Sequence, residues 1–544
     1  MKHHRLDKTT IEKTSIGFYV GNQLTKDGST LLGGFGHEPS SHWVSIVPAQ
    51  DHPKGSTMTV GATEDAVISG ELMDIPQVEH TFKYISSTYS EFEGFPPPLT
   101  NGGLNEHGVA GRDIWSDSRE ELVDMTPEPQ HGPNYSDLAR IAMERATSAR
   151  EAVDIIGDLI NKYGYTTYGG NSHLFADKNE GWVMIEYAGG QGLWAAERLG
   201  PDEVRVSYPG YIHNFPVHFQ DSDNYKGSDN IVSFAQKQGW WDPEHDNPNY
   251  LNLQNVYGTP FPGEGVSEKE NPFITWRVPP EREKELRSMV PVSLEDMLAL
   301  VRDPRWSNDH AGYGQVAHIR HHVPDALQTL WVAVTQAVTT PYVPVPIATD
   351  ALAVPPEFTQ HRYMTHESAS EYLSSDYAPQ EATKYATRTF KRLLYFTSEH
   401  PGLFLHYVTG IIESFEKDML EERQQLEKQF LELHQFNRMA EAKQLISKNV
   451  NQNFYKSLRL GIQLTNTVET ETLKRFGIRI PKNTADPGET TPPWSQSMVQ
   501  MTDEEMVTCY DAKLGPYPRQ YGIYSRGIPY SKEYITTILF KKGL

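Results

Sequence analysis

The chain has 544 residues, of which 38% are hydrophobic, and its formal net charge is −22. A chain of this length usually folds as roughly two to four domain-sized units or as one elaborated domain. The 49 basic side chains are outnumbered by 71 acidic ones and form no long run. Because nucleic-acid binding rests on clustered Lys and Arg, this composition argues against a nucleic acid partner.

Three further features of the sequence limit the classes of protein to which it can belong. The single cysteine, Cys509, excludes an intramolecular disulfide framework and a metal site built on several cysteines. No stretch approaches the roughly 18 consecutive apolar residues of a membrane span. Residues 1–14 lack the apolar middle of a secretory signal. We therefore expect a soluble, cytoplasmic protein that contacts neither nucleic acid nor membrane.

From Ser15 to about Pro346 the pattern predicts mostly strands, interrupted by a few helices. Short runs rich in branched and aromatic residues are the signal for each strand. The predicted strands are residues 15–20, 29–34, 43–48, 181–188, 193–199 and 203–212. The first two are joined through Lys26–Gly28, a sequence that can form a turn.

Between these strands, residues 137–160 have the spacing of helices. Leu138, Ile141 and Ala142 recur at helical intervals, and Ser148 followed by Glu151 is a capping-box signature that begins a second helix. The order of strands, helices and strands predicts helices layered on antiparallel sheet more than a strict alternation of strand and helix.

A different pattern begins near Ala378. Apolar residues from Ile412 to Leu433 recur at intervals of three, four or seven, and charged residues fill the other faces. This spacing is typical of a long amphipathic helix. Residues 482–496 are rich in Pro and Thr, and they predict a break before a Tyr-rich tail.

The common catalytic and cofactor motifs are absent. The sequence has no GxxxxGK[ST] phosphate loop, no HExxH zinc motif and no GxSxG nucleophile elbow. The run His318–His322 has no partner carboxylate at a recognisable spacing, so a surface or core role is favoured over a metal site. Gly33–Gly36 is too short for a nucleotide loop and favours a turn between strands. We expect no metal and no cofactor.

Ser15 stands directly before the first predicted strand, and the residues that precede it are mostly polar. A serine hydroxyl is a weak nucleophile unless a base sits beside it, and the residue's own α-amine serves once the chain is cut before it. The reference pKa of an α-amine, about 7.7 to 8.0, suits general base work near neutrality. Taken alone, the pattern leaves open a catalytic Ser15 and an ordinary serine before a strand.

Four sequence blocks favour the catalytic interpretation. They are Ser15 with Gly21 and Asp27–Thr30, then NGGLNEHGVAG (101–111), SHLFADKNEGWVMIEYAGGQGLWAAERL (172–199) and LWVAVTQAVTTPYVPVP (330–346). In this order they resemble the C69 dipeptidase family of N-terminal nucleophile (Ntn) hydrolases, over roughly residues 15–450. The choloylglycine hydrolases and penicillin V acylases share the core that this resemblance implies.

The resemblance implies an α+β fold, namely a four-layer αββα sandwich of two antiparallel sheets between helix layers, with an added C-terminal helical region. It also implies a division of the chain. The parts would be a propeptide (1–14), a hydrolase core (15–377), a helical region (378–481) and a Pro/Thr-rich linker with a tail (482–544).

The implied reaction is hydrolysis of an amide. Ser15, exposed by autocatalytic removal of the propeptide, would attack the carbonyl, and its α-amine would take the proton and later give it to the leaving amine. Asn105 aligns with an oxyanion-hole Asn, although an Asn that only holds the LNEHG turn fits equally well. Asn214 corresponds to a second oxyanion position, a few residues after the place where Tyr208 or Tyr211 stands.

The chain also departs from the family pattern. Its nucleophile is Ser15 where the family normally has Cys. The family often carries Arg-Asn-x-Asp after the Asp-Gly-Ser strand, but residues 34–37 are Gly-Phe-Gly-His, so the expected Arg and Asp are gone. His37 is the candidate to hold the α-amine or the substrate, although a neutral imidazole cannot replace a carboxylate charge. Trp182 and Glu186 lie in a matching block, where a buried strand pair would look the same.

Three functions stay open from the sequence. The favoured one is an active serine-type dipeptidase, the second is an acylase that cuts an N-acyl amide, and the third is a non-catalytic, scaffold-like relative. A cysteine replaced by serine to trap a precursor would also give this sequence. The expected partner is a small peptide or acyl-amide substrate, and the sequence leaves open a homo-oligomer.

Overall fold

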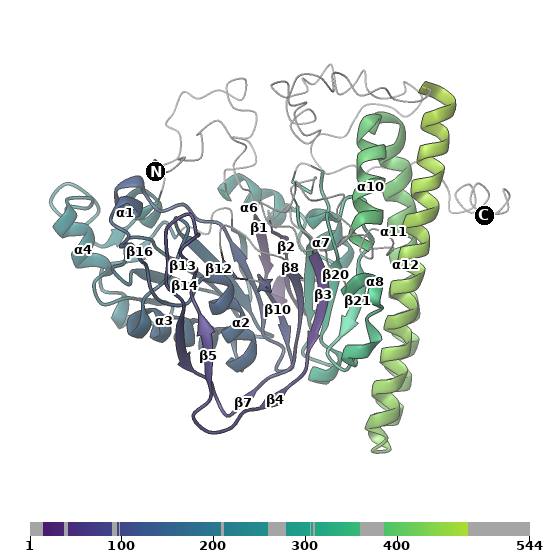
Figure 1. The fold of residues 1–544 in the computed structure, drawn as a ribbon, viewed down its shortest axis with the longest axis horizontal. Coiled ribbons are helices and arrows are strands. Elements are labelled where there is room, and N and C mark those ends of the chain that lie inside the picture. The colour runs from purple at the N-terminus through teal and green to yellow at the C-terminus, as the bar shows by residue number, and fades with distance from the viewer. Residues whose placement is uncertain are drawn as a thin grey trace.

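The computed structural model describes residues 15–36, 42–89, 95–96, 98–207, 212–258, 279–304, 306–307, 311–359 and 386–476. Over these ranges the chain is a mixed α and β structure with two large antiparallel sheets (Figure 1). The predicted fold class is confirmed at that level. The predicted propeptide (1–14) and the linker and tail (482–544) lie outside the described residues, as do His37, Tyr208, Tyr211 and Cys509.

The first sheet contains the strand that begins directly after Ser15. Its order is β15-β1-β2-β19-β20-β21, and each neighbouring pair is antiparallel. Its strands are β1 (Ile16–Val20), β2 (Thr30–Phe35), β15 (Val204–Ser207), β19 (Gly314–Ile319), β20 (Thr329–Ala333) and β21 (Val343–Pro346). Strand β1 is therefore held on both sides, by β2 and by β15.

The second sheet follows the order β17-β14-β13-β12-β11-β10-β8-β3, with β9 paired to β8. Its strands are β3 (His42–Val47), β8 (Tyr84–Tyr89), β9 (Leu99–Thr100), β10 (Gly102–Asn105), β11 (Ala110–Ile114), β12 (Asn171–Ala176), β13 (Gly181–Glu186), β14 (Trp194–Leu199) and β17 (Tyr225–Gly227). Short ladders pair β4 (Gln50–Asp51) with β7 (His80–Thr81), β5 (Thr57–Val60) with β6 (Met73–Pro76), and β16 (Phe215–Pro216) with β18 (Tyr250–Leu251).

The two sheets pack against each other, and a glycine allows their close approach at β1. Strands β1 and β2 contact β11 and β12. A Cβ atom on Gly17 would lie 3.0 Å from Cδ1 of Ile114 and 3.1 Å from Cδ2 of Leu174. Because glycine has no Cβ, the start of β1 lies directly against the second sheet.

Residues of β1 alternate between two apolar clusters, as the two-residue period of a strand requires. Ile16, Phe18 and Val20 pack in one cluster with helix α7 (Leu294–Val301), which contacts β2 and β19. Tyr19 belongs instead to the cluster between the sheets. The first sheet is therefore covered by a helix on one face and by the second sheet on the other.

Helices α2 (Tyr135–Arg145) and α3 (Ala149–Tyr163) cover the second sheet through contacts with β10, β11, β12 and β13. They confirm the helical prediction for residues 137–160, which the structure divides at Ser148. The Ser148 side chain accepts a hydrogen bond from the backbone N of Glu151 at 3.1 Å, as predicted. The reciprocal half of the capping box differs, because the Glu151 carboxylate accepts from the N and Oγ1 of Thr147 instead.

Three long helices lie together at one end of the molecule (Figure 1). They are α10 (Ala386–Glu399), α11 (Pro401–Gln435) and α12 (Met439–Phe476), which contact one another, and α12 also contacts β21. Helix α11 confirms the long amphipathic helix predicted from Ile412 to Leu433. The remaining helices are α1 (Glu120–Asp124), α4 (Ile231–Gln238), α5 (Leu253–Tyr257), α6 (Pro279–Ser288) and α8 (Pro356–Thr359). None of the helices in the described ranges combines the length and the apolarity needed to cross a bilayer.

Two predictions of turns differ from the structure. Gly33 and Gly34, which fall both in the predicted strand (29–34) and in the predicted turn (33–36), lie inside β2, where both are buried between neighbouring strands, so the strand prediction is confirmed and the turn prediction is wrong. The connection between β1 and β2 is longer than the expected Lys26–Gly28 turn, because a 3₁₀ helix over Asn22–Leu24 precedes it. Pairing with β1 and β19 outweighs the local preference of the two glycines for a turn.

Candidate active site

Ser15 lies at the buried start of β1, with 4% of its surface exposed. The register pairs Ile16 with Phe35 and Gly17 with Gly34, which places Ser15 beside Gly36. Gly17 faces the second sheet, and side chains along a strand alternate between the two faces. The Ser15 side chain is therefore directed into the space between the sheets, from a strand end that two neighbours hold in place.

The guanidinium of Arg112 lies beside this strand end. Arg112 comes from β11 of the second sheet and is fully buried. Its Nη2 donates to the backbone oxygens of Phe35 at 2.6 Å and Asp113 at 3.2 Å. A Cβ atom on Gly17 would lie 3.4 Å from its Cδ, and one on Gly34 would lie 2.8 Å from its Nη1. The guanidinium thus occupies the space that a side chain at residue 34 would need.

Buried aromatic rings border Arg112. The Tyr313 ring centroid is 5.8 Å from the Arg112 Cζ, and the His42 ring lies 5.4 Å from that of Tyr313. His42 also stacks on Tyr89 at 4.9 Å. The backbone N of Gly312 donates to the carbonyl of Gly36 at 2.9 Å, which ties the segment before Tyr313 to the end of β2.

The sequence prediction missed Arg112, Tyr313 and His42. One signal for Arg112 was present, because two charged residues, Arg112 and Asp113, directly follow the block of residues 101–111 within the short run AGRDIW. A charged residue is rarely buried without a specific partner. No comparable signal marks Tyr313 or His42, since aromatic residues are common in buried strands.

Asn105 is buried at the end of β10, and its side chain makes four hydrogen bonds. Its Nδ2 donates to the carbonyls of Met143 at 3.1 Å and Ala146 at 2.7 Å, at the end of α2. Its Oδ1 accepts from the backbone N of His107 and of Val109, each at 3.0 Å. Both amide hydrogens are used within the protein, so an oxyanion could receive one only if a bond to α2 were broken. In this geometry Asn105 holds the LNEHG turn, which is one of the two roles that the sequence left open.

The other predicted site residues are not brought together with Ser15 by any recorded contact among the described residues. Asn214 is exposed, one residue before β16, and His37 lies outside the described ranges. Trp182 and Glu186 are both buried in β13. The indole of Trp182 donates to Glu180 at 2.8 Å, and the Glu186 carboxylate contacts Nδ1 of His173 at 2.8 Å. Both residues therefore act within the second sheet.

The Asp-Gly-Ser segment forms a tight turn before β2. Oδ1 of Asp27 accepts from the backbone N of Ser29 at 3.1 Å and from its Oγ at 2.6 Å, and Gly28 has a φ of +72°. Gly28 suits this left-handed conformation because it lacks a Cβ. The backbone O of Ser29 accepts from Oγ1 of Thr25 at 2.7 Å. The turn is therefore closed by its own side chains.

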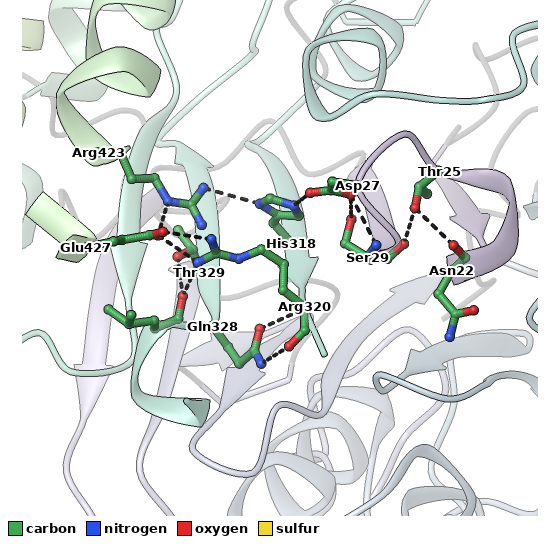
Figure 2. Close-up of polar contacts among 11 residues, drawn as sticks. Asn22, Thr25, Asp27, Ser29, His318, Arg320, Gln328, Thr329, Arg423 and Glu427 are labelled. Atoms are coloured by element: carbon green, nitrogen blue, oxygen red, sulfur yellow. Dashed lines mark hydrogen bonds and ion pairs between the residues drawn. The ribbon is translucent and has the colours of Figure 1, made fainter. Parts of the chain in front are cut away.

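The same turn is linked to helix α11 by a chain of polar contacts, which Figure 2 shows. Oδ2 of Asp27 contacts Nε2 of His318 at 2.7 Å, and Nδ1 of His318 lies 3.2 Å from Nη1 of Arg423 on α11. Glu427 accepts from Arg423 at 2.7 Å and from Arg320 at 2.7 and 2.9 Å. We call Asp27, Ser29, His318, Arg320, Arg423 and Glu427 the α11 network.

The partners of His318 fix its tautomer. Arg423 can only donate, so Nδ1 accepts and the proton lies on Nε2, which donates to Asp27. Burial, helped by the nearby charges of Arg423 and Arg320, lowers the pKa of His318 to about 4, so the imidazole is neutral at pH 7. Burial alone would raise the pKa of Asp27, but the hydrogen bonds from His318 and Ser29 hold it well below its usual range.

The α11 network contains Ser, His and Asp but is not a nucleophilic triad. Ser29 donates to Asp27 and not to His318, and Ser29 is fully buried. In a triad the histidine must accept the serine proton. Within the part of the chain that the structure describes, no group of three or more His, Cys, Asp or Glu could hold a metal ion.

Comparison with known proteins bears on the segment that begins at Ser15. Residues 15–270 match the model of peptidase family C69. We call residues 15–270 the C69 region, after the family whose model they match. The C69 region contains Ser15, Asp27, Asn105 and Arg112, whereas His318 and the α11 residues of the network lie after it.

Curated relatives match stretches of similar length. A probable dipeptidase B of Lactococcus lactis subsp. lactis (strain IL1403) is 29% identical over 251 residues, which are 44% of this chain and 48% of that protein. A probable dipeptidase of Latilactobacillus sakei is 25% identical over 267 residues, 48% of this chain and 50% of that protein. This chain therefore spans about half the length of each relative.

One solved structure also aligns with the chain. It is a mutant conjugated bile acid hydrolase from Clostridium perfringens, at 9% identity and a TM-score of 0.22. The alignment covers 65% of this chain and 97% of that one. A likeness at this score says nothing about the fold of the C69 region.

Proposed function

We propose that this chain is an amide hydrolase of the dipeptidase type, with Ser15 as nucleophile. One observation carries the proposal: the C69 match begins at Ser15, which is buried directly before β1, a strand that pairs with β2 from Ile16 and with β15 from Gly17. A nucleophile needs a fixed position, and the sheet supplies it. The names of the curated relatives support a peptide as substrate.

The proposed reaction begins with cleavage between Thr14 and Ser15, which frees the α-amine of Ser15. The amine takes the proton of the Ser15 hydroxyl as the oxygen attacks the substrate carbonyl, and it later gives this proton to the leaving amine. Water then releases the acyl group from Ser15. The α-amine, with a reference pKa of about 7.7 to 8.0, is available in its neutral form near pH 8.

The proposal includes an αββα arrangement for the core. Contacts between β1 and β11, α7 on the first sheet and α2 with α3 on the second sheet support these four layers. In this arrangement the nucleophile stands between the two sheets, where bulk water is largely excluded. The cytoplasmic location, Asn214 as an oxyanion donor and His37 as a substrate contact remain predictions.

An N-acyl amide is the alternative substrate. Hydrolysis of a peptide and of an acyl amide use the same nucleophile and base, so the site chemistry does not separate them. The buried cation beside Ser15 favours a substrate that carries an anionic group, which a dipeptide does at its C-terminus.

Two measurements on the purified full-length protein test the proposal. Intact mass should show a chain that begins at Ser15, and a panel of dipeptides and N-acyl amides should reveal a hydrolysed substrate. A fully active protein that retains residues 1–14 would overturn the α-amine mechanism. A processed protein inert on every member of both substrate classes would overturn the hydrolase.

A further inference from the structure

Arg112 carries a buried positive charge that no carboxylate balances in the described part of the chain. Its Nη2 contacts two backbone oxygens, while Nε and Nη1 are buried without a hydrogen-bond partner among the described residues. Arg320 and Arg423 also each have one buried nitrogen without a hydrogen-bond partner among the described residues, but the other buried arginines differ in their charge balance. Arg302 pairs with Glu416, and Arg320 and Arg423 share Glu427. An uncompensated buried charge is strongly unfavourable, so Arg112 is expected to have a partner outside the described residues.

The position of this charge relates it to Ser15. The aliphatic part of the Arg112 side chain passes Gly17, and its guanidinium lies against Gly34 and the Phe35 carbonyl. The side chain therefore extends toward the Ser15 end of the β1–β2 pair. Ser15 and Gly17 share the strand face that looks onto β11. Because consecutive residues of a strand rise about 3.3 Å, the guanidinium lies within one or two residue lengths of the proposed nucleophile.

We propose that Arg112 binds the C-terminal carboxylate of a dipeptide whose amide bond is attacked by Ser15. This inference rests on the proposed function and names its substrate class. In a dipeptide a single carbon separates the carboxylate from the scissile nitrogen, so both groups fit beside one strand end. The unused nitrogens of Arg112, Nε and Nη1, lie on different edges of the guanidinium, so a carboxylate beside it accepts a charge-assisted hydrogen bond from one of them.

A matched pair of substrates tests this assignment in the full-length enzyme. One is a dipeptide and the other is the same dipeptide with a C-terminal carboxamide, which has the same shape and no charge. Replacing Arg112 with Met should lower kcat/KM for the acid by about 100-fold. It should change kcat/KM for the carboxamide by less than about threefold, since no charge pair is lost there. Arg112→Lys should recover at least about tenfold of the loss on the acid, because it restores a point charge.

Arg198→Met is the control. Arg198 lies on β14 of the same sheet as Arg112 and is paired with Glu180, and β13 and β12 separate β14 from β11 in the sheet order. It should leave the ratio of the two substrates unchanged. An equal loss on acid and carboxamide in Arg112→Met would overturn the proposal, because it would assign Arg112 to the developing oxyanion or to the position of Ser15.

A binding measurement separates this inference from the proposed function. Ser15→Ala protein, which cannot form an acyl-enzyme, should still be stabilised against heat by the dipeptide more than by the carboxamide. The double variant Ser15→Ala/Arg112→Met should lose that difference. A second possible result is that the wild type hydrolyses nothing while Ser15→Ala still distinguishes the two compounds through Arg112. That result would contradict the proposed hydrolase activity and support the carboxylate site. Equal stabilisation of Ser15→Ala by both compounds would overturn the carboxylate site.

Discussion

Two buried polar clusters of this protein handle charge in opposite ways. The α11 network contains two carboxylates, two guanidinium groups and a neutral imidazole, so its charges balance. At the start of β1, Arg112 brings one positive charge beside Ser15 and meets only backbone oxygens among the described residues. Among the described residues, Arg320 and Arg423 each keep one buried nitrogen without a hydrogen-bond partner, but both pair with a carboxylate, whereas Arg112 has two such nitrogens and no carboxylate.

The difference separates a structural role from a binding role. A balanced, hydrogen-bonded network fixes the elements that contribute to it, here the turn before β2, strand β19 and helix α11. An unbalanced cluster costs stability unless a ligand completes it, which is typical of sites retained for function. Four experiments test this comparison.

The largest effect is expected at Ser15. Ser15→Ala should abolish removal of residues 1–14 and lower hydrolysis by about 10⁴-fold or more, since each step needs the same oxygen. Ser15→Cys should retain processing, because the reference pKa of a thiol, about 8.5, makes its proton easier for the α-amine to remove. Intact mass and initial rates give both results. If Ser15→Ala still hydrolysed the substrate, the activity would come from elsewhere in the chain.

The next effect concerns stability and belongs to the α11 network. Burial alone would raise the pKa of Glu427, but the hydrogen bond from Arg320 and the charge of Arg423 lower it to about 2. Glu427→Gln leaves both arginines without a counter-charge, so it should lower the free energy of unfolding by about 4 kcal/mol. Urea unfolding, with hydrogen exchange on α11 as a local probe, measures the change.

Glu422→Gln is the matched control on the same helix. Glu422 pairs with Lys456 at 3.1 Å, but both side chains are substantially exposed. Its loss should change the free energy of unfolding by less than about 0.5 kcal/mol. If Glu427→Gln and Glu422→Gln changed the free energy of unfolding by similar amounts, the α11 network would not have the proposed stabilising role. The hydrolytic rate of folded Glu427→Gln should stay within about tenfold of wild type.

His318 should make the stability depend on pH. Burial lowers its pKa in the folded state to about 4, from 6.5, so the unfolded chain binds the proton more tightly. This contribution is present above about pH 6.5 and is lost as the pH falls toward 4, and it amounts to about 3 kcal/mol. The low pKa of Asp27 acts in the same direction at more acidic pH.

Unfolding of wild type and His318→Gln at several pH values checks the slope. The variant should lose most of the dependence between pH 6.5 and 4, while losing stability at pH 7 through its altered contacts with Asp27 and Arg423. An unchanged slope would mean that His318 is already protonated in the folded protein at pH 6. In that case the assigned tautomer would be incorrect.

Short-range patterns in the sequence were enough to predict several elements of the fold. The apolar strand after Ser15 and the helix that begins at Ser148 depend on neighbours within a few residues, so their patterns are visible in the sequence. The partner of His318 was not visible, because Asp27 lies 291 residues away. Arg112 was missed for a related reason: only the packing of one sheet on the other brings it beside Ser15, and a single sequence contains no record of that register.

The smallest effect, and the one that separates two roles most directly, is expected at Asn105. Its four hydrogen bonds join the turn after β10 to the end of α2. Asn105→Ala should therefore lower the free energy of unfolding by about 2 kcal/mol, because buried carbonyls and N–H groups lose their partners. Per folded molecule, kcat should fall by less than about tenfold, since neither amide hydrogen is available to an oxyanion in this geometry.

The alternative makes the opposite prediction. If the Asn105 side chain donates to the oxyanion, Asn105→Ala should lower kcat by about 10² to 10³ even where folding is normal. Asn105→Asp sharpens the test, because it keeps the acceptor for His107 and Val109 and removes both donors. If Asn105→Ala is destabilised but keeps a normal kcat, Asn105 has a structural role, as the residues of the α11 network do. A stable variant with a large loss of kcat would place Asn105 in the Ser15 site and would require its bonds to α2 to open during the reaction.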